Sequence, residues 1–348
     1  MKRFVILLLL GIGLEAKVSD AQIANMFLLG FYGDENSIKR EVCTQGLGGV
    51  ILFKNSPIKK GAIKNFKDRA SLKRLTSSLK SCGRMPLIAV DQEGGLVQRI
   101  KFNISYPAPK DVAGRGEEFA KRVYLQMAKE LSSLGINLDF APVVDLAINP
   151  NNKVIVKYKR SFGDTEDTIK YASIFIDAMH RYKIATTLKH FPGHGSSLGD
   201  THFGFVDVTS LWREKELEPF IKLKDKADGV MVAHIYNKKL DPLFPASLSR
   251  RVVDYLLRKK LGFRKVVISD DLQMGAIAKR YSLRDRVKYS INAGVDILLF
   301  ANQVSPKRVV KLDRLIEIVR ELLERGEIRE SSIIKANRRI NQLKRELY

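Results

Sequence analysis

The chain has 348 residues, 45% of them apolar, which suffices for the core of one α/β barrel with extra helices. Its formal net charge is +23, but Lys and Arg are spread along the whole chain and no run interleaves them with aromatic residues. Composition therefore argues against a nucleic-acid-binding platform. A solvated basic surface and an anionic partner are both compatible with this charge.

The N-terminus begins with Met1-Lys2-Arg3, continues through the almost wholly apolar run Phe4–Leu14 and then reaches Ala16. This pattern predicts a signal peptide over residues 1–16 and a periplasmic or secreted protein. The apolar run is too short to span a bilayer comfortably, so no stable membrane insertion is expected beyond this segment. The alternatives are a buried first strand or an uncleaved anchor, and a cytoplasmic location.

Eight short apolar runs recur between residues 17 and 348, each followed by a loop and a helical pattern. The runs are continuous rather than alternating, as expected for strands buried on both faces of a parallel sheet. Amphipathic helices are predicted between them, including Glu117–Leu134, Thr165–Tyr182 and Ser247–Lys260. The runs are Met26–Phe31, Gly49–Phe53, Leu87–Val90, Asn137–Pro142, Ala185–Leu188, Gly229–Ala233, Val266–Ser269 and Asp296–Phe300.

Eight strand–helix units predict an α/β fold, a single (β/α)8 barrel of the TIM type that occupies residues 17–348. The tail, Pro306–Tyr348, adds two charged C-terminal helices that are broken near Arg325-Gly326. An open doubly wound sheet is the competing architecture. It requires a glycine-rich phosphate turn after the first strand, and the sequence has none there.

The chain has two cysteines, Cys43 and Cys82, and both come shortly before apolar runs predicted to form neighbouring strands. They are therefore expected to lie near each other at one end of the barrel. We hypothesise a disulfide in an oxidising compartment, and two free or partly buried thiols are the alternative.

Polar residues cluster after the ends of the third, fifth, sixth and seventh runs, which a barrel places around one mouth. The largest cluster, Lys189–Gly195 followed by Asp200-Thr201-His202, holds three of the five histidines, and its glycines and proline predict a turn. His194 is expected to be structural within this turn, and His180 to lie on the surface. The remaining clusters are Asp91–Gly95 with Arg99, then His234, whose role is open, and Ser269-Asp270-Asp271, where Asp271 is a candidate cap for a helix beginning near Leu272.

Four of these segments together resemble glycoside hydrolase family 3, and more narrowly its single-domain β-N-acetylglucosaminidases. The matching part of the chain runs from about Ile23 to Asn302. No one motif is specific alone, but four in the family's order are specific together. They are Ala89–Arg99, Arg160–Gly163, Lys189–Gly195 with Asp200-Thr201-His202, and Ser269–Met274.

The resemblance implies a retaining mechanism through a covalent glycosyl-enzyme intermediate. Asp270 would be the nucleophile and Asp271 structural, because the two match the family's Ser-Asp-Asp motif. His202 would be the acid/base, oriented by Asp200, and an imidazole suits that role because it titrates near neutrality. The same match implies that the sugar is bound by Asp91, Arg99, Arg160, Lys189, His190 and Met274.

Three departures from the family pattern stand out. Leu96 occupies a position where the family often has Arg, and Thr201 replaces the more usual Ser between Asp and His. The segment before Arg160, Val156–Lys159, lacks a glycine that is often found there. That last departure leaves the local turn open.

The function implied is hydrolysis of terminal β-linked N-acetylglucosamine from a glycan or muropeptide, with peptidoglycan fragments as the source. No metal or organic cofactor is expected, because the histidines lie on turns without a fourth ligand in zinc-site spacing. Three alternatives are a β-glucosidase or xylosidase of the same family, an N-acetylglucosaminide phosphorylase, and a non-catalytic cell-wall binding protein. The Asp200–His202 pair argues against the first, because those enzymes generally take a carboxylate acid from elsewhere.

Overall fold

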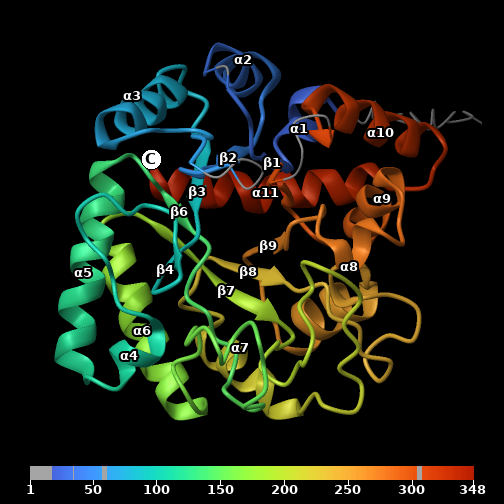
Figure 1. Cartoon of the computed structure of the whole chain (residues 1–348). Coiled ribbons are helices and arrows are strands. Elements are labelled where there is room, and N and C mark those ends of the chain that lie inside the picture. The colour runs from blue at the N-terminus through green and yellow to red at the C-terminus, as the bar shows by residue number, and fades with distance from the viewer. Residues whose placement is uncertain (1–17, 34, 57–60, 304–307) are drawn as a thin grey trace, which may run out of the picture.

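The predicted (β/α)8 barrel is confirmed by a computed structural model that describes residues 18–33, 35–56, 61–303 and 308–348 (Figure 1). Its eight parallel strands follow the order β10-β1-β2-β3-β6-β7-β8-β9, and a parallel bridge between Ile268 and Ile297 brings the two edges of the sheet together. The predicted signal peptide, residues 1–16, lies outside the described residues. The barrel strands are β1 Phe27–Leu29, β2 Gly49–Ile51, β3 Leu87–Val90, β6 Leu138–Asp139, β7 Ala185–Phe191, β8 Gly229–Val232, β9 Val266–Ser269 and β10 Leu298–Phe300.

Seven strands lie within the predicted apolar runs, and every strand residue of the barrel is buried, as a sheet covered on both faces requires. The prediction was wrong at β7, which continues past Leu188 to Phe191 and takes Lys189 and His190 into the strand. The pairing register with β8 shifts between Leu188 and Phe191. The extension is possible because both polar side chains find buried carboxylate partners, which the periodicity of the sequence does not reveal.

The helices cover the outside of the barrel, and several begin at a polar cap. Asp68, Asp164 and Ser282 each accept a hydrogen bond from a backbone N–H in the first turn of the helix that follows. The α-helices are α1 Asp20–Ala24, α2 Glu35–Arg40, α3 Arg69–Lys80, α4 Pro109–Ala113, α5 Glu117–Ser133, α6 Thr165–His180, α7 Glu218–Leu223, α8 Gly275–Ala278, α9 Leu283–Ala293, α10 Leu312–Glu324 and α11 Glu330–Leu347.

The helix predicted over Ser247–Lys260 is divided in two. A 3-10 turn, η3 (Ala246–Leu248), is followed by extended backbone at Ser249 and then by a π-helix, η4 (Arg251–Lys260). The break forms because the Ser249 hydroxyl accepts a hydrogen bond from Val252 N (3.0 Å) and donates one to Asp241 Oδ2 (2.5 Å). Two further elements are the π-helix η1 (Glu41–Gln45) and the 3-10 helix η2 (Glu214–Leu217).

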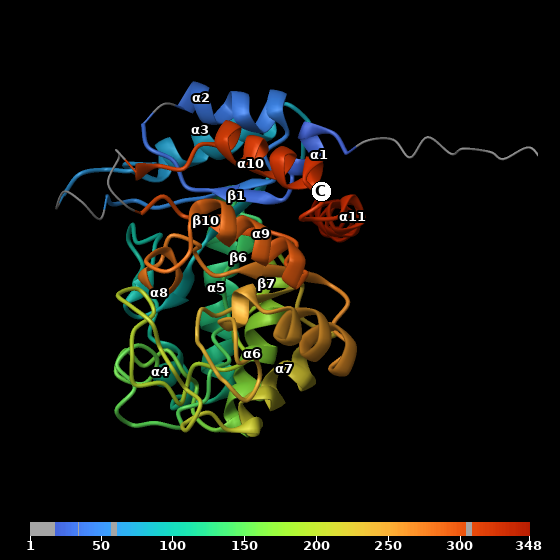
Figure 2. The ribbon, with the colours of Figure 1, turned by 90° about the vertical axis from the view of Figure 1, so that its right-hand side faces the viewer.

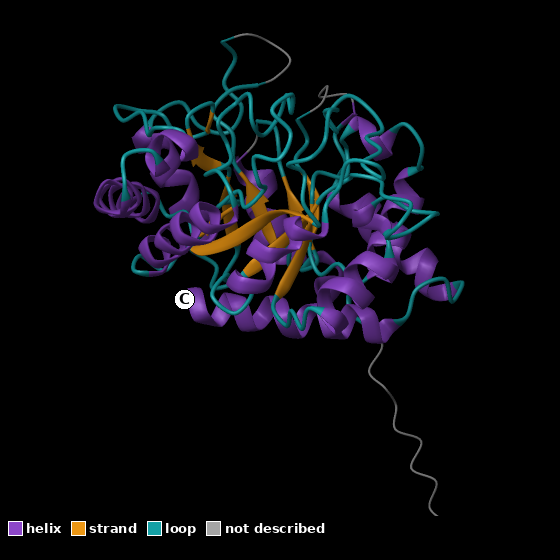
Figure 3. Cartoon of the chain, turned by 90° about the horizontal axis from the view of Figure 1, so that it is seen from below, coloured by secondary structure: helices purple, strands orange, loops and turns teal. Residues whose placement is uncertain are grey.

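The two predicted C-terminal helices are α10 and α11, and α11 lies across the end of the barrel opposite the loops that follow the strands (Figures 2 and 3). Asn337 of α11 donates to Gln22 O (2.8 Å), and Arg339 pairs with Asp296 just before β10 (2.8 Å). These contacts hold α11 against the amino ends of the strands, and the opposite face is left to the long loops. Among the described residues, no helix combines the length and apolar composition needed to cross a membrane.

The hypothesised disulfide is confirmed: Cys43 and Cys82 are bonded, with their Cα atoms 5.6 Å apart. It joins η1 to the turn after α3, elements that flank β2 on either side in the chain. A short hairpin, β4 (Gln92–Gly94) and β5 (Val97–Gln98), follows β3 on the opposite side of the barrel from α11. It carries residues of the candidate site.

Candidate active site

One cavity of about 580 Å³ lies at the carboxyl ends of the strands, a size typical of small-ligand sites. We call it the central cavity. It is built mainly from the loops that follow β2, β3, β6, β7, β9 and β10, which a barrel gathers at one face. All nine residues predicted from the sequence line it: Asp91, Arg99, Arg160, Lys189, His190, Asp200, His202, Asp270 and Met274.

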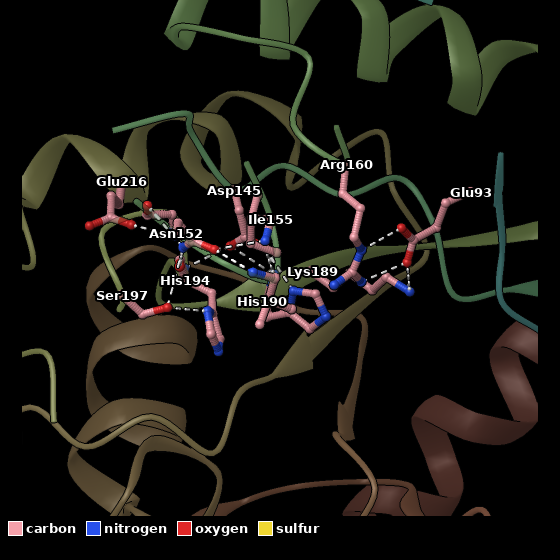
Figure 4. Close-up of polar contacts among 12 residues, drawn as sticks. Glu93, Asp145, Asn152, Ile155, Arg160, Lys189, His190, His194, Ser197 and Glu216 are labelled. Carbon is pink, nitrogen blue, oxygen red and sulfur yellow. Dashed lines mark hydrogen bonds and ion pairs between the residues drawn. The ribbon is translucent and has the colours of Figure 1, made fainter. Parts of the chain in front are cut away.

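A buried carboxylate, Glu93, organises the cations on one side of the cavity (Figure 4). Arg160 donates to it through Nε (2.7 Å) and Nη2 (2.8 Å), and Lys189 Nζ lies 2.6 Å from its Oε1. Burial alone would raise the pKa of Glu93, but the charges of Arg160 and Lys189 outweigh it and hold that pKa below its usual range. Glu93 was not among the predicted site residues, although it stands two residues after Asp91 in the same motif.

Asp91 completes this group at the cavity wall. Its Oδ1 lies 3.0 Å from Lys189 Nζ and its Oδ2 lies 3.7 Å from Arg99, whose guanidinium sits over the Phe53 ring. Two carboxylates therefore share three cations. The result is a fixed set of hydrogen-bond donors and acceptors of the kind that sugar hydroxyls and an acetamido group require.

A second missed carboxylate, Asp145, orders the histidine-rich segment at the end of β7 and in the turn that follows it. Its Oδ2 lies 2.7 Å from His190 Nδ1, and its Oδ1 accepts from the backbone N–H of His194 (2.7 Å). This contact leaves His190 Nε2 as the ring nitrogen away from Asp145, on a residue that lines the central cavity. Asp145 is the first carboxylate after the strand β6, so the rule that found Asp91 and Asp270 could also have found it.

His194 is structural, as predicted from the turn. Its Nδ1 lies 2.8 Å from Ser197 Oγ, and burial lowers its pKa to about 4, so the ring is neutral near pH 7. The adjacent Gly195 packs directly on the backbone of Leu146, where an added Cβ would lie 1.8 Å from a carbonyl oxygen. Glu216 Oε2 accepts from Gly195 N (3.0 Å) and so fixes the same turn. Nothing in the sequence pattern pointed to Glu216.

Asp270 follows the last residue of β9 and lines the central cavity. Burial works to raise its pKa, but the neighbouring histidines, His234, His190 and His202, lower it below the usual value. The carboxylate is therefore ionised at neutral pH. Its Oδ1 accepts from Asp271 N (2.8 Å), which orients the group at the end of the strand.

Asp271 and His234 hold the loops behind Asp270. Asp271 Oδ1 accepts from Gln273 N and Ala301 N, both at 3.1 Å, and so joins the loops after β9 and β10. The suggested helix cap is wrong, because α8 begins only at Gly275 with Met274 as its N-cap. One ring nitrogen of His234 lies 2.6 Å from Ser247 Oγ and the other lies 2.9 Å from the Asp271 carbonyl oxygen. The role of His234, which the sequence left open, is therefore to support these loops from a buried position.

His202 and Asp200 form the predicted pair, with Nδ1 and Oδ1 2.7 Å apart. The His202 side chain is 62% exposed, whereas Asp270, which lines the same cavity, is less exposed. The backbone beside His202 packs on α8: Gly275 N donates to His202 O (3.1 Å) and Ala276 N to Thr201 O (3.0 Å). The loop with the imidazole is thus tied to the segment that follows Asp270.

His180 lies at the surface, as predicted, and its Nε2 lies 2.7 Å from Asp228 Oδ2. Within residues 18–33, 35–56, 61–303 and 308–348, no group of three or more His, Cys, Asp or Glu side chains is placed to hold a metal ion.

The chain is similar to known proteins over most of its length. A profile of the glycosyl hydrolase family 3 N terminal domain matches residues 15–343. The β-hexosaminidase of Tolumonas auensis is 38% identical over 267 residues, covering 74% of this chain and 76% of that protein. That of Xanthomonas axonopodis pv. citri is 35% identical over 295 residues, covering 79% and 83%.

Solved structures agree with the fold. A glycoside hydrolase family 3 β-N-acetylglucosaminidase from Paenibacillus sp. superposes with a TM-score of 0.83 at 29% identity. The match covers 95% of this chain but only 63% of that longer protein. A β-N-acetylhexosaminidase from Beutenbergia cavernae gives a TM-score of 0.80 at 26% identity, over 94% of this chain and 99% of the other.

Proposed function

The chain belongs to glycoside hydrolase family 3, and from that premise we propose that it is a retaining exo-β-N-acetylglucosaminidase. The family and the relatives at 35–38% identity support the broader statement, a β-hexosaminidase. The finer proposal is removal of terminal β-linked N-acetylglucosamine. The observation that carries it is one cavity bordered by an ionised Asp270 and by the His202–Asp200 pair.

In the first step, the Asp270 carboxylate attacks the anomeric carbon while His202 protonates the departing glycosidic oxygen. The Nδ1–H of His202 donates to Asp200, so Nε2 is the nitrogen that exchanges the catalytic proton. Asp200 stabilises the imidazolium whenever the ring is protonated. In the second step, His202 takes a proton from water, which attacks the glycosyl ester, and Asp270 leaves as a carboxylate.

The cation cluster gives the sugar-binding side of the proposal. Asp91 offers acceptors to sugar hydroxyls, and Lys189, Arg99 and Arg160 offer donors to hydroxyls and to an acetamido carbonyl. Glu93 neutralises part of this charge, so the donors stay oriented without attracting a free anion strongly. His190 and Met274 complete the wall.

Two observations support an exported enzyme that acts on peptidoglycan fragments. The Cys43–Cys82 disulfide suits an oxidising compartment, where such bonds persist. The net charge of +23 suits anionic muropeptides. Fractionation of cells tests the first point, because reduced protein found only in the cytoplasm would contradict export.

The decisive experiment compares turnover of 4-nitrophenyl β-N-acetylglucosaminide with that of the matching glucoside. We expect strong preference for the first, and equal rates would favour the β-glucosidase alternative. Asp270→Ala should lose at least about 10³-fold in kcat, because covalent catalysis goes with it. Exposed Glu117→Ala is the control carboxylate variant and should remain near wild type.

The acid/base assignment needs its own test. His202→Ala should slow substrates with poor leaving groups more than aryl glycosides, because protonation matters most for them. An equal loss on both would remove His202 from the role. Repeating the assay with inorganic phosphate distinguishes the phosphorylase alternative, which predicts N-acetylglucosamine 1-phosphate as the product.

A further inference from the structure

Lys64 is a buried cation that the proposed mechanism does not use. It lies in the loop after β2, and only 5% of it is exposed. Its Nζ donates to Ala301 O (2.9 Å) and to Asn302 O (3.0 Å), which both lie in the loop after β10. Burying an ammonium group costs free energy unless it is hydrogen-bonded, so a lysine at this position must be held by specific partners.

The Lys64 side chain joins two strands that are not neighbours in the barrel. Because β1 lies between β2 and β10, Lys64 crosses the carboxyl end of β1 to reach the loop after β10. Two aromatic rings also stabilise the ammonium group, since Nζ lies 4.6 Å from the centre of the Phe53 ring and 4.8 Å from that of Tyr32. The loops after β1, β2 and β10 are thereby held together around one charge.

The loop that carries Lys64 is itself closed by hydrogen bonds. Asn65 Oδ1 accepts from Phe53 N (2.9 Å), and Asn65 Nδ2 donates to Phe31 O (2.8 Å). Lys64 N donates to Lys54 O (2.9 Å), so the outgoing and returning arms of the loop are paired. The ammonium group is therefore presented from a fixed backbone.

Ala301 links Lys64 to the loop of the proposed nucleophile. Its carbonyl accepts from Lys64 Nζ, and its N–H donates to Asp271 Oδ1 (3.1 Å). The N–H of Asp271 in turn donates to Asp270 Oδ1 (2.8 Å). Hydrogen bonds therefore connect Lys64 through Ala301 and Asp271 to the Asp270 carboxylate.

The charge of Lys64 is coupled to the same loop. Burial lowers the pKa of Lys64 to about 7, and the negative charge of Asp271 opposes that lowering. An ionised Asp271 therefore favours the ammonium form of Lys64. A neutral, apolar side chain at position 64 would take away both the hydrogen bonds to the two carbonyl oxygens and this charge.

The partners of Lys64 form part of the cavity wall. Phe53, Ala301 and Asp271 all line the central cavity, and Lys64 lies behind them. From this position Lys64 acts on the placement of the wall and not on the sugar directly.

We propose that Lys64 is a positioning residue for the nucleophile, which fixes the loops after β9 and β10 so that the Asp270 carboxylate is directed at the anomeric carbon. The inference rests on the proposed function, because a nucleophile has a role only if the central cavity cleaves a glycoside. It assigns to Lys64 an effect on the rate at which the glycosyl group is transferred to Asp270, and none on the affinity for the sugar.

The test compares Lys64→Met, which keeps an unbranched side chain without the charge, with Lys64→Arg, which keeps a cation and its donors. Assays are run at pH 6, where wild-type Lys64 is mainly protonated. In Lys64→Met the single-turnover rate with 4-nitrophenyl β-N-acetylglucosaminide should fall about tenfold, because misplacing a catalytic group by ~1 Å costs up to ~10²-fold and a smaller shift is expected here. N,N′-diacetylchitobiose should lose the same factor, since the nucleophile serves both substrates. Lys64→Arg should recover most of the rate, and the Kd of N-acetylglucosamine in calorimetry should stay unchanged in both variants.

The control is Lys67→Met, which removes an exposed lysine three residues further along the same segment and should leave every rate unchanged. Rates are expressed per folded protein, as measured by near-ultraviolet circular dichroism. If Lys64→Met does not fold, Lys64→Gln replaces it, because its amide still donates to one carbonyl oxygen, and a smaller loss is expected. Failure of both to fold would make Lys64 a purely structural residue and contradict the proposal.

The remaining outcomes separate this inference from the proposed function. A wild-type rate in folded Lys64→Met, or an effect confined to the Kd of N-acetylglucosamine, would overturn the positioning role and leave the function standing. If the wild-type enzyme cleaves no N-acetylglucosaminide, the function and the inference both fall.

Discussion

Gly275→Ala tests whether the loop that carries His202 is held by α8. In this position an added Cβ would lie 2.7 Å from the His202 carbonyl oxygen and 2.9 Å from the Phe203 carbonyl carbon. Both contacts are with backbone, so no side chain can rotate away. The loop itself must move, and the hydrogen bond from Gly275 N to His202 O (3.1 Å) is disturbed with it.

The size of the effect follows from the displacement. Ordinary van der Waals contact begins at 3.4 Å, so the His202 carbonyl must shift by about 0.7 Å. Misplacement of a catalytic group by ~1 Å can cost ~10²-fold in rate, so a loss of roughly 10- to 100-fold is expected. It should be largest for disaccharides, which need protonation of the leaving oxygen, and smallest for 4-nitrophenyl β-N-acetylglucosaminide.

A glycine in the same loop provides the control. Gly204 has open space where its Cβ would be, and its backbone is not in the left-handed region, so Gly204→Ala should behave as wild type. Steady-state kinetics on both substrates measure the outcome. Wild-type kinetics in Gly275→Ala, or an equal loss on both substrates, would show that α8 does not position the proposed acid/base His202.

Three further predictions concern stability. Glu93→Gln leaves buried cations without their partner and should lower the free energy of unfolding by about 3–5 kcal/mol in urea denaturation; a loss under 1 kcal/mol would contradict it. Replacing Cys43 and Cys82 together by Ala removes a cross-link of 39 residues and should cost about 4 kcal/mol, and reductant should destabilise wild type alone. Burial lowers the pKa of Lys344 to about 7, below its unfolded value, so the unfolded chain binds more protons between about pH 7 and 10. Stability relative to Lys344→Met should therefore rise with pH across that window, whereas exposed Lys335→Met should show no such trend.

The barrel could be predicted because its strands are continuous apolar runs. Such runs are typical of strands that are buried on both faces of a parallel sheet. The extension of β7 could not, since Lys189 and His190 are stable in a strand only when Glu93 and Asp145 face them. Those pairs join segments 96 and 45 residues apart, and a single sequence carries no trace of them. Local periodicity therefore predicts where β7 starts. Its continuation to Phe191 depends on the carboxylates of Glu93 and Asp145, which are distant in the sequence.

The candidate site, like the fold, could be predicted only in part. Burying a carboxylate directly after a strand costs free energy unless the group is paired or takes part in function. This cost identified Asp91 and Asp270 as candidate site residues. Glu93 stood in the same motif but received no role, because its role is to hold two cations rather than to meet the sugar. Residues that act through other residues give weaker signals than residues that face the cavity, because their position depends on the whole assembled site.

The surroundings of the carboxyl groups themselves favour one nucleophile. Burial raises the pKa of Asp139 well above its usual value, which disfavours the ionised form that could attack, whereas Asp271, whose pKa burial raises to about 6, has its Oδ1 occupied by the backbone N–H groups of Gln273 and Ala301. Glu93 and Asp91 lie within ion-pair distance of cations, which stabilise the negative charge that an attack would have to release. Asp270 is ionised by histidines at a distance, and its Oδ1 accepts one backbone N–H. A carboxylate that is charged yet not neutralised by a cation in contact is the one best able to attack an anomeric carbon, so these surroundings support the proposal that Asp270 is the nucleophile.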